Sequence, residues 1–453
     1  PTITLELADE TFVSDVELRD WSAMNEIWQM ESRRVQVSSD GFVNDIRDLG
    51  EVFAESGTQR WGNNVNAIWT APINQRARHI RLILQPADVE DARVYLAEAT
   101  VHGNRPAAAP KITAVTSGRL AGGDALAVIA GSESGQIRAF DASGEVLWSA
   151  KTNSSARINA LACADIDGDG RDEVIYGENA ARLGLLSADG ETIWEIIPPM
   201  YRGINSDVMN TTPADLDGDG RPEIVVGLRS WQYAAFDAEG ELLWTSVIYA
   251  HPATVSVADD FDGDGQPEFV GGNQYYRLNL IDTDGTMLYQ ADRFGPEQSA
   301  VASADADGDG LPDIIMGTDQ GELICFKGTN GSRLWTKNVG DRVARILPAD
   351  IDGDGAEEIV CAAESANVYA FQPDGELAWR TTLPGGVSDL LLLPGDEPRF
   401  AAAAGAAGVV LLSAEGQIIG AGETAERTLA LAQLDGRVAV SLHGGQIVSF
   451  DLD

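Results

Sequence analysis

Residues 164–174 read ADIDGDGRDEV, and the core of this segment, Asp-x-Asp-Gly-Asp-Gly, occurs five times in the chain. The copies begin at Asp165, Asp215, Asp260, Asp305 and Asp350, at intervals of 50, 45, 45 and 45 residues. A period in the forties is typical of stacked supersecondary units. Oxygen-bearing side chains at alternate positions of a glycine-rich turn are ligands for a hard cation, most plausibly calcium. The motif therefore predicts a repeat architecture and a metal together.

Each repeat around this motif reads as four short strands. In one unit, ADLDGDGRPEIVVG is followed by YAAFDAEG and ELLWTSV, so a glycine turn precedes a last strand that carries Trp. Four antiparallel strands per unit in a radial array form a β-propeller. The aromatic residue returns with the repeat period, which predicts a packing role, at Trp148, Trp194, Trp244, Tyr289, Trp335 and Trp379.

The length of the repeat region bounds the number of units. Residues 111–453 would give eight units of about 43 residues or seven of about 49, and the observed spacing is mostly 45. We predict an all-β chain with an eight-bladed propeller, and a seven-bladed ring is the alternative. Degenerate units lie at 111–150, 385–422 and 427–453. The last of these has three strands, and a strand near 104–112 is expected to complete it.

The acidic loops supply a nearly complete set of calcium ligands. Carboxylates occupy loop positions 1, 3, 5 and 9, position 7 can offer its backbone carbonyl, and glycines at positions 4 and 6 allow a tight turn. Without a cation these carboxylates would repel one another. No His or Cys enters the loops, which disfavours zinc and copper. About five structural Ca²⁺ ions are expected, with these ligands: Asp165, Asp167, Asp169, Arg171 and Glu173; Asp215, Asp217, Asp219, Arg221 and Glu223; Asp260, Asp262, Asp264, Gln266 and Glu268; Asp305, Asp307, Asp309, Leu311 and Asp313; Asp350, Asp352, Asp354, Ala356 and Glu358.

Composition narrows the classes of partner. The formal net charge is -40, and nucleic acid is an unfavourable partner because binding it needs a basic surface. No run approaches the roughly 18 apolar residues of a transmembrane segment. The first residue, Pro1, is not an initiator Met, so a mature or excised fragment is expected. The three cysteines, Cys163, Cys325 and Cys361, lie in apolar contexts and are expected to be buried free thiols.

Residues 1–103 contain no acidic loop and read as a separate β-sandwich or jelly-roll domain. Short alternating strands are predicted at 2–7, 13–20, 34–37, 67–69, 79–84 and 94–102. The segments RRVQVSSDG (33–41), HIRLIL (79–84) and VYLAEATVHG (94–103) resemble discoidin-like (coagulation factor 5/8 type C) domains, whose opening strands are missing here. That resemblance implies a truncated domain that binds glycans or membranes. Residues 104–110 (NRPAAAP) are predicted to be a linker.

The repeats from residue 111 onward resemble the FG-GAP/VCBS family, the calcium-loop repeats of integrin-type propellers. The FDAEGELLW half of a unit also resembles quinoprotein-type propellers. A quinone-dependent oxidoreductase is nevertheless disfavoured, because the vicinal Cys pair common in such enzymes is missing. Together the resemblances imply a secreted or cell-surface, calcium-stabilised protein.

The unusual residues collect in loops on the face opposite the acidic loops. In a four-stranded antiparallel blade, the second-to-third loops and the inter-blade loops both lie on that face. Aromatic rings and Arg suit sugar rings and their acidic groups. The ligand-binding candidates are Tyr201, Arg202, Asn205, Arg229, Trp231, Tyr233, Asn273, Tyr275 and Tyr276. Ordinary packing between blades is the competing interpretation.

Two functions remain open. The favoured one is a non-catalytic binding or adhesion module that recognises polysaccharide, or a cell-surface glycan or protein. The alternative is a polysaccharide lyase, since some rhamnogalacturonan and ulvan lyases are similar propellers. Such β-elimination needs a base beside a uronate and a cation that holds its carboxylate. His251 or Tyr249 is the candidate base, and Arg202, Arg229 and Arg277 are the candidate clamps.

Overall fold

The computed structural model describes residues 2–22, 30–40, 42–51, 53–61, 64–86, 96–104, 110–275, 277–291, 296–395 and 397–452. The chain divides into two compact units, Pro1–Ala108 and Ala109–Asp453, and their boundary falls within the predicted linker. Each unit is described by itself. Within the described part of the chain, no helix has the length and hydropathy that crossing a bilayer requires.

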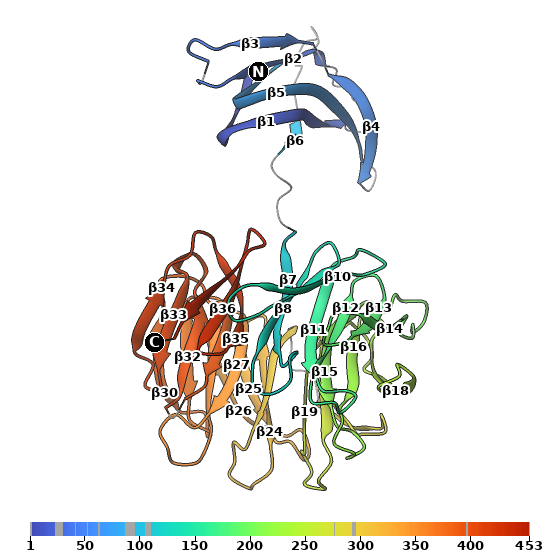
Figure 1. The fold of residues 1–453 in the computed structure, drawn as a ribbon, viewed down its shortest axis with the longest axis vertical. Helices are drawn as coiled ribbons and strands as arrows, with labels where there is room; N and C mark the ends of the chain where they lie inside the picture. Colours follow the sequence, from blue (N-terminus) through green and yellow to red (C-terminus); the bar gives the residue numbers. More distant parts are fainter. Residues whose placement is uncertain are drawn as a thin grey trace. The chain divides into compact units, whose positions relative to one another are not determined.

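The N-terminal unit is one antiparallel sheet with the order β3-β2-β5-β1-β6, and β4 also pairs with β5 (Figure 1). By pairing, the described strands form one continuous sheet, and the predicted sandwich or jelly-roll arrangement of this unit stays a prediction. The sheet is continuous because two long strands run through the whole unit and have partners at both ends. The strands are β1 (Thr2–Ser22), β2 (Met30–Ser38), β3 (Arg47–Gly50), β4 (Ala54–Trp61), β5 (Asn64–Pro86) and β6 (Leu96–Asn104).

Alternation of side chains explains the core of this sheet. Val35 and Val37 of β2 and Ile80, Leu82 and Leu84 of β5 are buried together. Residues i and i+2 of a strand point to the same face, so this pattern buries one face of the sheet. The strand periodicity predicted from the sequence is therefore present.

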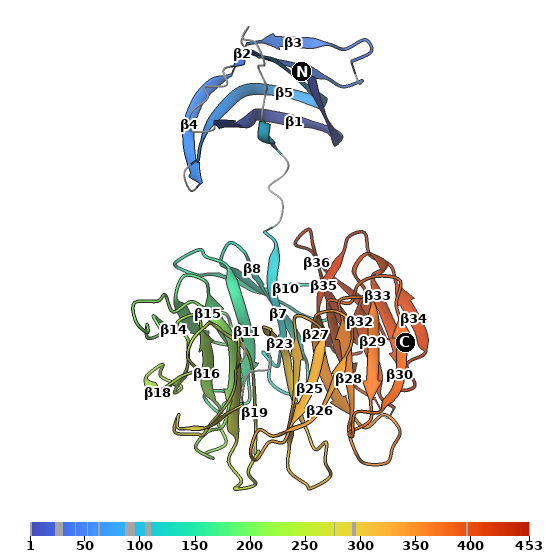
Figure 2. The same ribbon diagram turned by 180° about the vertical axis from the view of Figure 1, so that it is seen from behind.

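The C-terminal unit consists of consecutive antiparallel sheets arranged around an axis (Figure 2). Seven have four strands and the last has three, among the residues described. The first four sheets contain β7 (Ile112–Gly118), β8 (Ala127–Ser132), β9 (Gln136–Phe140), β10 (Val146–Lys151); β11 (Ile158–Ala164), β12 (Glu173–Glu178), β13 (Arg182–Leu186), β14 (Thr192–Ile196); β15 (Val208–Ala214), β16 (Glu223–Leu228), β17 (Gln232–Phe236), β18 (Leu242–Val247); and β19 (Ala253–Asp259), β20 (Glu268–Asn273), β21 (Leu278–Ile281), β22 (Met287–Ala291). The last four contain β23 (Gln298–Ala304), β24 (Asp313–Thr318), β25 (Glu322–Phe326), β26 (Arg333–Asn338); β27 (Val343–Ala349), β28 (Glu358–Ala363), β29 (Asn367–Phe371), β30 (Leu377–Thr382); β31 (Asp389–Leu393), β32 (Arg399–Ala403), β33 (Val409–Ser413), β34 (Ile418–Gly422); and β35 (Thr428–Leu434), β36 (Arg437–Leu442), β37 (Ile447–Asp451). A short 3-10 helix, η1 (Gly405–Ala407), precedes β33.

The first strands of these sheets line the axis and close the ring. Each contacts the first strand of the next sheet, and β35 contacts β7. At this junction Ser117 Oγ donates a hydrogen bond to Gln433 O at 2.7 Å. The strand at Ile112–Gly118 pairs with β8 in the first sheet. Residues 104 and 112 of the strand predicted to complete the last sheet therefore belong to other sheets, and residues 105–109 lie outside the described residues.

The periodic aromatic residues pack one sheet against the next, as predicted. Trp148 Nε1 donates to Ala188 O at 2.9 Å, and Trp194 Nε1 donates to Ala238 O at 2.8 Å. Each acceptor lies in the turn between the third and fourth strands of the following sheet. A Cβ on Gly190 would come within 2.5 Å of the Trp148 ring, so glycine is needed for this approach. The same contact recurs for Trp244, Tyr289, Trp335 and Trp379.

The three cysteines are free thiols, as predicted. Cys325 and Cys361 are fully buried, and Cys163 is half-buried.

Candidate functional site

The five acidic loops join the first and second strands of five consecutive sheets, from β11–β12 to β27–β28. In each loop, positions 1, 3 and 9 converge, with ligand atoms within 4.8 Å of one another. The clusters are Asp165, Asp167 and Glu173; Asp215, Asp217 and Glu223; Asp260, Asp262 and Glu268; Asp305, Asp307 and Asp313; and Asp350, Asp352 and Glu358.

Local hydrogen bonds shape each loop. Asp165 Oδ1 accepts from Gly168 N at 2.8 Å, and Asp165 Oδ2 accepts from Gly170 N at 3.0 Å. These glycines have φ values of 78° and 86°, a region that other residues rarely adopt. The same two bonds recur in the other four loops. The loop conformation is therefore encoded by its own sequence.

The predicted ligands at positions 5 and 7 stand apart from these clusters. Asp169 Oδ1 accepts from Arg171 N at 2.8 Å, and Asp169 is outside the cluster of its loop. The Arg171 guanidinium pairs with Asp189 at 2.7 Å. Ligation through Asp169, Asp219, Asp264, Asp309 and Asp354, or through the carbonyls of Arg171, Arg221, Gln266, Leu311 and Ala356, stays a prediction.

One buried carboxylate oxygen without a partner, and the raised pKa of another buried carboxylate, are consistent with a cation in these loops. Glu358 is fully buried, and its Oε1 has no hydrogen-bond partner among the described residues. Burial, together with the negative charge of Asp262, raises the pKa of Glu268 to about 7. A charged group away from water is costly unless an opposite charge compensates it. Calcium, which prefers oxygen ligands, would provide that charge.

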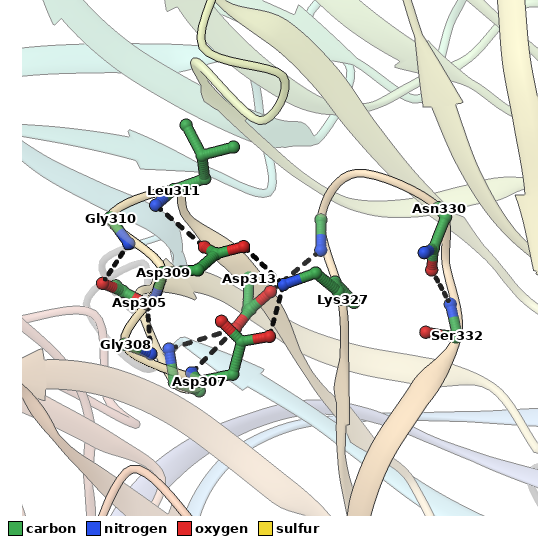
Figure 3. A network of polar contacts seen from close by, with 12 residues as sticks. Asp305, Asp307, Gly308, Asp309, Gly310, Leu311, Asp313, Lys327, Asn330 and Ser332 are labelled. Carbon is green, nitrogen blue, oxygen red and sulfur yellow. Dashed lines mark hydrogen bonds and ion pairs between the residues drawn. The ribbon is translucent and has the colours of Figure 1, made fainter.

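The fourth loop differs because a cationic side chain from another turn contacts one of its converging carboxylates (Figure 3). Lys327 Nζ donates to Asp309 Oδ2 at 2.6 Å and also pairs with Asp307 Oδ2. Lys327 comes from the turn between β25 and β26, and sequence analysis did not single it out. The rarity of lysine, which occurs only four times in the chain, could have drawn attention to Lys327. Its pairing with the acidic loop could not be predicted, because it depends on how the turn folds back onto the loop.

On the opposite face, loops from consecutive sheets bring several predicted ligand residues together. The Arg202 guanidinium lies 5.3 Å from the Tyr201 ring and 5.5 Å from the Tyr249 ring. The rings of Trp231 and Tyr249 meet edge to face, with centroids 6.0 Å apart. His251 contacts Tyr275 with centroids 4.9 Å apart. We call Tyr201, Arg202, Trp231, Tyr249, His251 and Tyr275 the aromatic loop cluster.

Other candidates are placed differently. Tyr233 is fully buried, and its hydroxyl donates to Val255 O and Gly272 O, so it is a packing residue and cannot face a ligand. Asn273 is buried, and its Oδ1 accepts from Tyr275 N and Arg277 N, so it shapes the loop. Tyr276 lies outside the described residues.

Three further candidates are held by neighbouring side chains. Arg229 pairs with Asp207 at 3.2 Å, and Asn205 Nδ2 donates to the same carboxylate. Arg277 Nη1 donates to Gln290 Oε1 at 2.9 Å. The partial neutralisation of Arg229 makes Arg202 the stronger candidate for an anionic group.

Sequence analysis missed the residues that anchor the cluster. Ser206 is buried and donates to Pro198 O, and Gln232 is buried and donates to Pro199 O. These bonds hold the loop that presents Arg202. Two apolar side chains on that loop, Ile197 and Met200, are 61% and 62% exposed. Nothing periodic in the sequence marked these four residues.

Comparison with known proteins supports the fold. The FG-GAP-like repeat family matches residues 165–226 and 260–316, and no curated protein matches the chain. The match does not include residues 1–103, where the discoidin-like resemblance stays a prediction.

Solved structures extend the comparison to about three quarters of the chain. Saccharomyces cerevisiae Sqt1 is 9% identical, with a TM-score of 0.64 over 77% of this chain and 97% of its own. The computationally designed Ika8 protein is 15% identical, with a TM-score of 0.60 over 76% and 96%. Moraxella catarrhalis BamB is 18% identical, with a TM-score of 0.52 over 72% and 92%. Identities this low show the fold alone. The chain therefore contains FG-GAP-like repeats within a β-propeller-like structure of four-stranded sheets.

Proposed function

We propose that this protein is an extracellular, calcium-stabilised, eight-bladed propeller that binds polysaccharide through the aromatic loop cluster. The convergence of Arg202, Trp231 and Tyr249 from three different loops carries the proposal. The calcium ions would act on the other face as structural elements. Recognition is proposed to be non-catalytic.

Exposure and backbone conformation support a binding role for the cluster. Tyr249 and Tyr275 are 50% and 51% exposed, although burying an aromatic ring is favourable. Arg202, Trp231 and His251 have φ values of 53°, 66° and 118°. Non-glycine residues at positive φ cost free energy and concentrate at functional sites. Ordinary packing between sheets would require neither feature.

The chemistry of the cluster favours an acidic sugar. Flat aromatic rings pack against the apolar faces of sugar rings. A guanidinium binds a carboxylate or sulfate through two parallel hydrogen bonds. Arg202 makes no ion pair with any described residue, so its charge is available to a ligand. The strongly acidic remainder of the chain would then limit binding of anionic chains to this patch.

A panel of neutral, uronate-containing and sulfated polysaccharides tests the proposal. Binding is measured in calcium with wild type, Arg202→Ala and Tyr249→Ala. We expect wild type to prefer acidic chains, and each substitution to weaken binding by about tenfold or more, as for interface hot spots. Met200→Ala, an exposed change on the same loop, is the control and should bind normally. Equal binding by all four proteins, or none by wild type, would overturn the glycan proposal.

A polysaccharide lyase is the alternative for the same cluster. His251 and Tyr249 lie on one loop, and Arg202 lies beside Tyr249, so a base and a carboxylate clamp are close together. Ultraviolet absorbance of unsaturated products, followed during the binding assay, distinguishes the two functions. If wild type forms unsaturated products and His251→Ala does not, the lyase function would be favoured over non-catalytic binding.

A further inference from the structure

We propose that Lys327 is a built-in cation of the fourth acidic loop, which makes this loop the weakest of the five calcium sites and keeps it ordered without an ion. The inference rests on the proposed calcium occupancy of the loops and is independent of the polysaccharide site. It concerns the loop that begins at Asp305.

The lysine contacts the carboxylates that would otherwise face the ion. Its ammonium pairs with Asp307, a member of the converging cluster, and with Asp309 at position 5 (Figure 3). The Lys327 side chain is 22% exposed, so water screens these pairs incompletely. One positive charge is thus already present where calcium would bring two.

The last carboxylate of the fourth loop is also satisfied without an ion. This residue is Asp313, whereas the other four loops have Glu at position 9. Asp313 Oδ1 accepts from Gly328 N at 3.0 Å, and Oδ2 accepts from Ala306 N at 3.1 Å. In the fifth loop, by contrast, Glu358 Oε1 is buried without a partner. The fourth loop therefore has less need of an added cation.

The equivalent turn position in the neighbouring sheets carries no cation. Lys327 N donates to Ser332 O across its turn, and the same bond is made by the residue that begins each corresponding turn. Those residues are Ser187, Asp237, Asp282 and Gln372. The built-in cation is thus specific to one repeat and is not part of the repeat design.

The nearest comparison is Arg221 in the second loop, and its contact is different. Arg221 pairs with Asp219 at position 5, which lies outside the converging cluster, and both side chains are well exposed. Exposed pairs contribute little. Lys327, in contrast, bonds to a member of the cluster, so calcium must displace it or bind beside a like charge.

Counting ions on the full chain tests the proposal. The protein is stripped with a chelator and dialysed against calcium alone, and bound ions are measured by atomic spectroscopy. We expect four tight ions and a fifth bound at least about tenfold more weakly, because ligand charge sets calcium affinity. Lys327→Met, which removes the charge and keeps an unbranched side chain of nearly the same length, should give five tight ions. The reciprocal variant Gln372→Lys adds a lysine to the corresponding turn of the sheet with the fifth loop. It should bind one tight ion fewer than wild type.

Amide hydrogen exchange in chelator provides a local readout. Gly308 N and Gly310 N, which bond to Asp305, should stay protected in wild type and lose protection in Lys327→Met. Gly353 N and Gly355 N of the fifth loop should lose protection in both proteins.

Three results would overturn the inference. Five equivalent ions in wild type, or unchanged binding in both variants, would reject the role of Lys327 and leave the calcium proposal intact. Failure of wild type to bind any calcium would reject the role of Lys327 and the calcium proposal together. The glycan assay tests neither the role of Lys327 nor calcium binding. The Lys327 inference and the polysaccharide proposal can therefore fail independently.

Discussion

Five sheets of the propeller carry acidic loops, whereas the first sheet and the last two join the same strands without them. The strand pairing is nevertheless alike, since β7–β8 and β35–β36 form the same antiparallel ladder as β11–β12. In the last sheet, Leu434 and Arg437 pair directly across a turn of Asp435 and Gly436. The blade therefore forms without an acidic loop. Only the loops that bring three carboxylates together offer a site for an ion.

The turn of the first sheet, which has no acidic loop, uses carboxylates from the two neighbouring sheets. Asp172 accepts from Arg119 N at 2.7 Å, and Asp435 accepts from Leu126 N at 3.3 Å. Acidic loops instead bond to their own amides and keep carboxylate oxygens for a cation. The first arrangement does not require a cation, and the second should depend on calcium.

Calcium removal should have the largest effect. One site at a hundredfold excess of ligand over Kd contributes about 2.7 kcal/mol of stability, so several sites sum to on the order of 10 kcal/mol. Thermal unfolding in calcium and in chelator measures this difference. Hydrogen exchange should show the loss in the sheets between Ile158 and Thr382 first. Equal unfolding midpoints in calcium and in chelator would show that the acidic loops do not stabilise the protein through calcium.

The effect of Glu358→Gln on the free energy of unfolding should have opposite signs in calcium and in chelator. In calcium, loss of a charged ligand should cost about 2–3 kcal/mol, in the range of charge-assisted bonds. In chelator, the variant should be as stable as wild type or more stable, because the buried unpartnered charge is gone. Denaturant unfolding in both buffers checks this. Glu376→Gln, an exposed change in the same sheet, should have no effect in either.

Stability in chelator should fall as pH rises. The pKa of Glu268 is raised to about 7 in the folded state, so the folded chain holds a proton that the unfolded chain releases at lower pH. Stability is therefore greatest below the ordinary Glu pKa and decreases through the window up to about 7, by at most about 1.4 kcal/mol per pH unit for one group. Calcium should abolish this slope. A flat profile in chelator would show that Glu268 is compensated by other means.

Trp379→Phe should have the smallest effect and should not depend on calcium. The Trp379 indole donates to Ala414 O in a sheet without an acidic loop. Loss of one hydrogen bond costs about 1 kcal/mol. Trp194→Phe removes the equivalent bond between two sheets with acidic loops. If both variants lose a similar amount of stability in calcium and in chelator, packing between blades does not depend on ion binding. A loss that changes with calcium would show that the two are coupled.

Residues 1–103 show where strand patterns are insufficient. Short alternating strands were predicted there, and strands are present, but β1 and β5 are 21 and 23 residues long. Alternation marks which face of a strand is buried and carries no information about how many sheets a long strand joins. The pattern therefore did not reveal that two long strands join the strands of this unit into one continuous sheet.

The sequence alone determined the repeat period, the acidic loops, the strand-turn pattern and the aromatic residues between sheets. These features depend on bonds within a few residues, such as Asp165 to Gly168, or on contacts that every repeat makes with the next. Tertiary structure alone decided that Tyr233 is buried, that Arg202 meets Tyr249 and that Lys327 reaches Asp307. Such contacts join residues about 20 to 50 positions apart. Their geometry follows from how whole sheets pack, which no local pattern encodes.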